Sequence, residues 1–336
     1  MAMPLRARLA ALTLAPMLSA TTCFAASNLH TPSAQTTSAT SNAAIPNTVH
    51  YRTVKIDGLN IFYREAGSPD APVILLLHGF PASSFMYRDL MARLSDKFHL
   101  IAPDYPGFGY SDAPSPQAFS YTFDNLADIT AKFTQALGLN RYALYMQDFG
   151  GPVGFRLASR YPQKVSFLIA QNANAYAEGL PDSFWTPART LWRDPSPANY
   201  EKIRSAAMSD EALEWNYTHG VKDPSQIDPE SWILQRTLLS RPGNKDAMLA
   251  LLYDYRTNLG HYAEWQSYFR QNQPPLLIVW GKNDAIFPAP GAQAYLRDLP
   301  KAELHLLDTG HFALEDHADE IARLTREFFD HKVPKG

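Results

Sequence analysis

An aspartate at position 148 lies where the local pattern of the chain places a nucleophile. Residues 141–147 form a short, mostly apolar segment that predicts a buried strand, and residues 148–151 predict a tight turn. Residues 152–160 predict a helix that opens with proline in its first turn. A strand, a sharp turn and a helix in this order are typical of a nucleophile elbow. A carboxylate there predicts attack on an sp3 carbon, a covalent alkyl-enzyme ester and hydrolysis of that ester by water.

Three further motifs follow predicted strands. They are His78-Gly79-Phe80-Pro81 after residues 73–77, Gly281-Lys282-Asn283-Asp284 after residues 276–280, and Thr309-Gly310-His311 after residues 304–308. The resulting chain order of nucleophile, acid and histidine is that of a hydrolase triad. Asp284 is expected to orient His311, and a neutral imidazole with the ordinary pKa of about 6.5 is suited to take a proton from the attacking water.

The pattern resembles the α/β-hydrolase family, and within it the aspartate-nucleophile branch of epoxide hydrolases and haloalkane dehalogenases. The resemblance covers roughly residues 50–332 and includes Pro-Asp-Tyr-Pro-Gly-Phe-Gly-Tyr-Ser at residues 103–111. It implies an α/β fold with a mostly parallel central sheet, helices on both faces and an inserted helical cap. It also implies these roles: Asp148 as nucleophile, Asp284 as acid, His311 as base, and the backbone N–H groups of Phe80 and Phe149 as oxyanion donors.

The order of strand and helix signals supports this architecture. The two signals alternate from residue 51 to about residue 172 and resume after residue 265, which favours a mainly parallel sheet with helices on both faces. The intervening segment is rich in tryptophan and tyrosine and is interrupted by prolines, so it predicts a helical cap over the carboxyl ends of the strands. The predicted strands are 51–57, 60–65, 72–77, 98–102, 141–147, 165–170, 276–280 and 303–307, and the predicted core helices are 84–94, 123–137, 152–160, 291–297 and 317–330. The predicted domains are a signal peptide at 1–25, a flexible tether at 26–47, the first part of the core at 48–172, the cap at 173–265 and the second part of the core at 266–336.

The N-terminal segment predicts export. Arg6 and Arg8 precede an apolar stretch at residues 9–18, and small residues up to Ala25 suit a cleavage site, as in a signal peptide. The apolar stretch is too short to cross a membrane. The following segment is rich in serine, threonine, alanine and asparagine, which predicts a flexible tether. We therefore expect a periplasmic or secreted protein in preference to a cytosolic one.

Composition narrows the class of partner. The chain has 336 residues, 46% of them hydrophobic, and a net charge of -3, so it offers no basic surface for nucleic acid. The ten histidines show no metal-binding spacing such as H-E-x-x-H. We expect no metal and no cofactor, and a small apolar or amphipathic organic substrate together with water. The oligomeric state is left open.

The cap offers one main candidate for substrate chemistry, Tyr255 in Asp-Tyr-Arg-Thr-Asn. Opening an epoxide leaves an alkoxide that needs an O–H donor, usually tyrosine, whereas halide release needs N–H or aromatic groups. The resemblance implies either role for Tyr255: a donor to the epoxide oxygen, or a contact to the halogen. Trp192 is the one cap tryptophan predicted to line the pocket. A second tyrosine donor is open among Tyr176, Tyr200 and Tyr217.

Two motifs point to different substrates. Gln147-Asp148 resembles the dehalogenase elbow, whereas His78-Gly79-Phe80-Pro81 is the epoxide-hydrolase form. Phe149 stands where dehalogenases carry a halide-binding tryptophan, and Phe80 stands where many carry asparagine; a phenylalanine side chain has no hydrogen-bond donor. Opening of epoxides to diols is therefore the leading expectation. The alternatives are hydrolytic haloalkane dehalogenation and, in a different class, a receptor-like protein that binds its ligand without turning it over.

Overall fold

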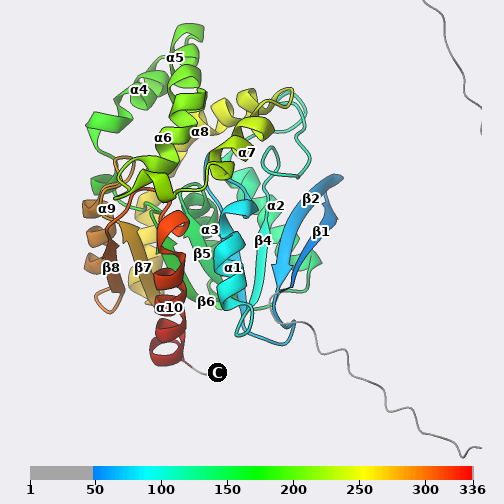
Figure 1. The fold of residues 1–336 in the computed structure, drawn as a ribbon, viewed down its shortest axis with the longest axis vertical. Coiled ribbons are helices and arrows are strands. Elements are labelled where there is room, and N and C mark those ends of the chain that lie inside the picture. The colour runs from blue at the N-terminus through cyan, green and yellow to red at the C-terminus, as the bar shows by residue number, and fades with distance from the viewer. Residues whose placement is uncertain (1–47, 335–336) are drawn as a thin grey trace, which may run out of the picture. The chain divides into compact units, whose positions relative to one another are not determined.

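A mixed sheet of eight strands organises residues 48–334, which are the residues described by this computed structural model (Figure 1). The spatial order is β1-β2-β4-β3-β5-β6-β7-β8; β1, β2 and β4 pair antiparallel, and all the other neighbours pair parallel. The predicted signal peptide and tether lie outside the described residues. The strands are β1 (Val49–Ile56), β2 (Leu59–Ala66), β3 (Val73–Leu77), β4 (His99–Pro103), β5 (Tyr142–Gln147), β6 (Val165–Gln171), β7 (Leu276–Gly281) and β8 (Glu303–Leu307).

Helices cover both faces of the sheet, as the alternation in the sequence predicts. Successive side chains of β5 enter two different cores: Leu144 and Met146 join one hydrophobic cluster, and Ala143 and Tyr145 join the other. This follows from the alternation of side chains along a strand. Helices α2 and α3 contribute to the first core, and α1 and α10 to the second. The core helices are α1 (Arg88–Leu94), α2 (Phe123–Ala136), α3 (Gly150–Arg160), α9 (Ala289–Ala294) and α10 (Leu314–Lys332).

Five helices lie between β6 and β7, in the segment where a helical cap is expected. They appear above the sheet in Figure 1. The longest of them, α8, continues past residue 265, so the helical segment extends beyond the expected cap. None of the helices in residues 48–334 is long and apolar enough to cross a membrane. The five are α4 (Asp182–Arg193), α5 (Pro197–Met208), α6 (Asp210–Thr218), α7 (Glu230–Leu239) and α8 (Asn244–Asn272).

The ends of several core helices differ from the expected positions. The predicted helix at 84–94 begins with a 3-10 turn, Ser84–Tyr87, before α1, and the predicted helix at 291–297 is α9 followed by the 3-10 turn Tyr295–Arg297. Helix α3 begins two residues before the proline that was expected to open it. Helix ends depend on hydrogen bonding of the last turns, which local sequence specifies weakly.

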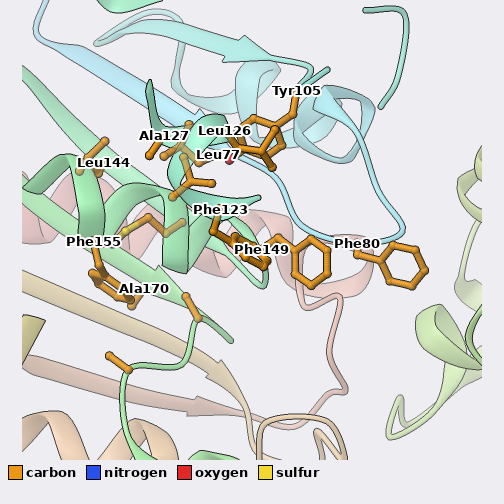
Figure 2. Packing of buried hydrophobic residues seen from close by; sticks show 14 of the residues in the cluster. Leu77, Phe80, Tyr105, Phe123, Leu126, Ala127, Leu144, Phe149, Phe155 and Ala170 are labelled. Carbon is orange, nitrogen blue, oxygen red and sulfur yellow. The ribbon is translucent and has the colours of Figure 1, made fainter. Parts of the chain in front are cut away.

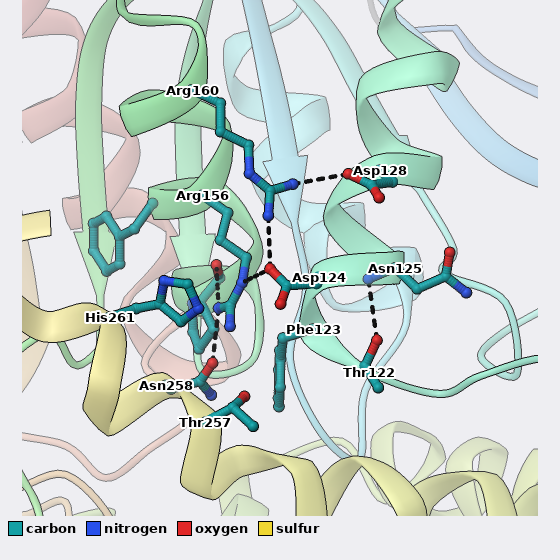
Figure 3. A network of polar contacts seen from close by, with 12 residues as sticks. Thr122, Phe123, Asp124, Asn125, Asp128, Arg156, Arg160, Thr257, Asn258 and His261 are labelled. Carbon is teal, nitrogen blue, oxygen red and sulfur yellow. Dashed lines mark hydrogen bonds and ion pairs between the residues drawn. The ribbon is translucent and has the colours of Figure 1, made fainter. Parts of the chain in front are cut away.

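Polar side chains join α8 to the core (Figure 3). The backbone N–H of Phe123, at the start of α2, donates to Asp254 Oδ2 at 2.9 Å. The buried Arg156 of α3 donates from Nε to Asp124 at 2.9 Å and from Nη1 to Asn258 Oδ1 at 2.7 Å. Asp254 and Asn258 flank Tyr255 in sequence, so these bonds set the position of that turn of α8 against the core.

Candidate active site

The elbow residue Asp148 has a left-handed backbone conformation, with φ of 49°. Such values are uncommon outside glycine, and they persist where the surrounding structure holds them in place. Two glycines allow the close packing that this turn requires. A Cβ at Gly79 would overlap with the side chain of Asp148, and one at Gly154 would overlap with the thioether of Met146. Gly154 therefore explains how a side chain as large as that of Met146 fits beside the elbow.

The carboxylate of Asp148 is buried and points at two groups of the site. Its Oδ1 accepts a hydrogen bond from the backbone N–H of Phe80 at 2.7 Å, and its Oδ2 lies 3.6 Å from Nε2 of His311. A donor in this position stabilises negative charge on Oδ1. Phe149 follows Asp148 directly, and its ring stacks on that of Phe80 at a centroid distance of 5.7 Å (Figure 2).

Asp284 binds the other ring nitrogen of His311, Nδ1. It follows β7, and its Oδ2 accepts from Nδ1 of His311 at 2.7 Å. Its Oδ1 accepts from the backbone N–H groups of Ile286 at 2.7 Å and Phe287 at 3.2 Å. A buried carboxylate with this many donors is fixed in orientation, and it fixes the imidazole in turn.

His311 is charged in the resting site, which corrects the expectation of an ordinary pKa. Burial by itself lowers the pKa of His311, but the charge of Asp284 and the contacts with Asp148 outweigh it and raise the pKa to about 10. The expectation was wrong for the resting state because the sequence does not show that two carboxylates flank one ring. The same geometry stabilises an imidazolium in the proposed reaction.

Two residues that position the triad were not predicted from the sequence. Asn172, just past β6, donates from Nδ2 to Oδ2 of Asp284 at 2.6 Å, and its backbone oxygen accepts from the N–H of Asp148 at 3.3 Å. Gln147 places its side-chain Nε2 3.0 Å from Nε2 of His311. Both residues are fully buried. Their position directly at the ends of β5 and β6 is the signal that would have identified them, since catalytic groups gather at this edge of the sheet.

A cavity of about 500 Å³ opens above the nucleophile. Its floor contains Phe80, Asp148 and Phe149, and its walls come from the cap helices α4, α5, α6 and α8. Most lining residues are apolar, including Trp185 and Trp215. A mostly apolar cavity with one buried, reactive carboxylate has the character of a small-molecule site. Among residues 48–334, no group of three or more histidine, cysteine or acidic residues is arranged to hold a metal ion.

Tyr255 lies directly behind the cavity wall. Its ring contacts those of the lining residues Trp185, at 4.7 Å, and Phe149, at 6.0 Å, measured between centroids. Burial, followed by the nearby hydroxyl of Tyr262 and the charge of Asp148, raises the pKa of Tyr255. The Tyr255 hydroxyl is buried and makes no hydrogen bond of normal geometry within the described part of the chain. It is thus a neutral donor close to the nucleophile.

The other aromatic candidates of the cap lie elsewhere. Trp192 stacks on Tyr255 at 6.3 Å and donates its indole N–H to the backbone oxygen of Leu252; it is not among the cavity-lining residues of the described chain. The tryptophans that do line the cavity, Trp185 and Trp215, were expected to be packing residues. The three tyrosines left open as a second donor do not line it either: the Tyr176 hydroxyl donates to Asp298, Tyr200 packs on Tyr253, and Tyr217 stacks on Phe312.

Comparisons with known proteins show the family of this chain. The model of the alpha/beta hydrolase fold matches residues 72–206. The chain is 40% identical to an uncharacterized hydrolase of Saccharomyces cerevisiae, covering 79% of this chain and 92% of that one. It is 31% identical to haloalkane dehalogenase 2 of Mycobacterium tuberculosis (80% and 91% covered), and 26% identical to epoxide hydrolase 3 of Xenopus tropicalis (83% and 77%). The solved structure of Cfl2 from Burkholderia cenocepacia shares the fold, with a TM-score of 0.71, 24% identity, and 84% of this chain and 96% of that chain covered. The chain therefore belongs to the α/β-hydrolase family.

Proposed function

We propose that this hydrolase acts through an ester on Asp148 and opens epoxides to diols. The observation that carries the proposal is the arrangement of one imidazole between two carboxylates, 2.7 Å from Asp284 and 3.6 Å from Asp148, under an apolar cavity. Asp148 reaches the cavity, whereas Asp284 is satisfied by protein donors. The carboxylate that lines the cavity is the nucleophile, and the one bonded to protein donors orients the histidine.

The reaction has two half-reactions. In the first, a carboxylate oxygen of Asp148 bonds to an epoxide carbon, the ring C–O bond breaks, and the alkoxide takes a proton from the phenol of Tyr255. In the second, His311 takes a proton from water, which attacks the ester carbonyl while the Phe80 N–H stabilises the oxyanion. The diol leaves with a proton from His311. Before water attacks, the proton that His311 carries at rest replaces the one that Tyr255 gave, and the proton released as Asp148 ionises again restores the imidazolium.

The hydrogen-bond donors around the cavity favour an epoxide. Of the two tryptophans that line the cavity, Trp185 donates its indole N–H to the backbone oxygen of Ile286, so this donor is occupied. The side chains of Phe80 and Phe149 have no donor. The phenol of Tyr255 is buried beside the hydroxyl of Tyr262, and it makes no hydrogen bond of normal geometry within residues 48–334. A phenol is acidic enough to protonate an alkoxide, and a weakly basic halide needs no such acid.

Haloalkane dehalogenation is the second candidate, favoured by the 31% identity to a haloalkane dehalogenase over 91% of that relative. Its first half-reaction would displace halide and would use the same three triad residues.

A receptor that binds without turnover is disfavoured, because the acid and base have no role in binding alone. The test of the covalent step is common to both hydrolytic activities.

Substitution His311→Gln tests the covalent intermediate. Without a base the ester should form but persist, so the variant incubated with an epoxide should gain the mass of the substrate on the peptide that contains Asp148. The measurement is intact and peptide mass spectrometry. The control is the double variant Asp148→Ala/His311→Gln, which should stay unmodified. An active wild type whose His311→Gln variant gains no adduct would rule out the ester mechanism.

Substitution Tyr255→Phe separates the two substrates. On an epoxide it removes a hydrogen bond that strengthens in the transition state, so alkylation should slow by about 10- to 1000-fold. On a haloalkane it should have a much smaller effect. Burst kinetics on both substrate types measure the alkylation step. If the variant alkylates with epoxides at the wild-type rate while wild-type enzyme releases halide from a haloalkane, the dehalogenase assignment replaces the epoxide one.

A further inference from the structure

The cavity has a buried end and an open end. The residues around the nucleophile, Asp148, Phe80 and Phe149, are buried, and so are Trp185 and Ile286. Some lining residues on α4, α5 and α6 are exposed instead. Ser183, Ala206 and Glu211 are exposed, and Phe184 is 37% exposed. The cavity is thus a channel that leads from the nucleophile to the surface between these three helices.

The channel is much larger than the reacting group. An epoxide ring has three non-hydrogen atoms and occupies roughly 100 Å³ or less, if each atom takes about the volume of a water molecule. The cavity has about 500 Å³, a size that suits ligands of drug-like dimensions. Four alanines, one on α4, two on α5 and one on α6, provide this width: Ala188, Ala206, Ala207 and Ala212.

The charges of the channel are all negative. Apart from Asp148, the one charged residue among the lining residues of the described chain is Glu211, and no lysine or arginine lines the cavity. An anionic group on the remote part of a substrate would lie in an apolar channel beside Glu211, and none of the lining residues of the described chain there is a lysine or arginine that could pair with it. Like charges in such a setting repel, and repulsion of this kind discriminates between ligands.

We propose that the substrate is a bulky, uncharged epoxide whose apolar body fills the channel between α4, α5 and α6, and that Glu211 at the mouth selects against carboxylated substrates. This inference rests on the proposed function and adds to it a substrate class and a specificity residue. Glu211 acts on the part of the substrate remote from the reacting carbon.

A matched pair of substrates tests the charge selection: a para-oxiranyl benzoate methyl ester, which is neutral, and the corresponding carboxylate. Wild-type enzyme should turn over the ester at least about 10-fold more efficiently in kcat/KM. Glu211→Gln should raise kcat/KM for the carboxylate about 2- to 5-fold and change kcat/KM for the ester by less than that, since the repulsion between solvent-screened charges is of this size. The control is Glu214→Gln, one turn along α6 and outside the cavity lining, which should change neither value.

Narrowing the channel tests the size of the substrate. Ala207→Phe should reduce kcat/KM for the aryl epoxide at least about 10-fold and spare a three- or four-carbon epoxide. Ala198→Phe, at an exposed position of α5 outside the lining, should spare both. Equal turnover of ester and carboxylate by wild type, or equal loss of large and small epoxides in Ala207→Phe, would overturn this inference. Such a result would leave the proposed function intact if the His311→Gln variant still forms an adduct with the small epoxide; absence of that adduct would defeat the proposed function itself.

Discussion

The charge state of His311 changes during the proposed reaction. In the resting site its pKa is about 10, so the ring is protonated at neutral pH and cannot act as a base. Ester formation makes Asp148 neutral and removes one of the two negative charges that hold the proton. The pKa of His311 must then fall, and the ring can lose its proton before water attacks. The first half-reaction thus prepares the base for the second.

Removal of the Asp148 charge tests this coupling. The folded protein raises the pKa of His311 above 6.5, so the bound proton contributes stability that is fully present below about pH 6.5 and is lost as pH rises through about 10. Asp148→Asn should lower the pKa of His311 in an NMR titration. The loss of unfolding free energy between pH 7 and pH 10, measured in urea, should be smaller than in wild type. Asp319→Asn, at an exposed position on α10, should behave as wild type; an unchanged His311 pKa in Asp148→Asn would contradict the argument.

Helix α8 both packs on the core and carries Tyr255, the proposed proton donor. It carries Tyr255 toward the cavity wall, and it is fixed to α2 through Asp254 and to α3 through Asn258. Figure 3 shows the contact of Asn258 with Arg156. Arg156 also packs beside the rings of Phe123, at 5.8 Å, and Trp265, at 5.5 Å. Phe123 in turn contacts Phe149, with 4.9 Å between the ring centroids. The contacts of Arg156 with α2 and α8 therefore also support the floor of the cavity.

Substitutions at Asn258 test the contact between α3 and α8. Nη2 of Arg156 and Nδ2 of Asn258 are buried donors without a hydrogen-bond partner in the described chain. Asn258→Leu removes one of the acceptors of Arg156 and should lower the free energy of unfolding by about 1–3 kcal/mol. Asn258→Asp replaces an unbonded donor with an acceptor and should keep or raise stability. Urea denaturation measures both, with the exposed Gln271→Leu on α8 as control. A stable Asn258→Leu variant would show that the contact contributes little.

At the scale of the whole chain, we propose that residues 1–25 direct export and that residues 26–47 tether the hydrolase. Leu14→Arg places a charge in the apolar stretch and should leave the protein uncleaved in the cytoplasm. Thr37→Arg, in the proposed tether, should be exported and cleaved normally. Cell fractionation and N-terminal sequencing measure both outcomes, with a mature N-terminus expected near Ala26. A wild-type protein that keeps Met1 and stays in the cytoplasm would refute the proposal.

The sequence by itself determined the fold class and identified Asp148, Asp284 and His311 as candidates. Each of them follows a predicted strand, and the carboxyl ends of parallel strands meet at one edge of a sheet. Only the tertiary structure decided what surrounds them. The sequence places Gln147 and Asn172 at strand ends, but their contacts with His311 and Asp284 depend on how the strands align in the sheet. The pKa of His311 depends on two charges from separate strands. The cavity walls depend on how the cap helices pack, so Trp185 and Trp215 line the cavity while Trp192 does not. A helical pattern shows which residues share a face, but the packing partner of that face is set by contacts distant in sequence.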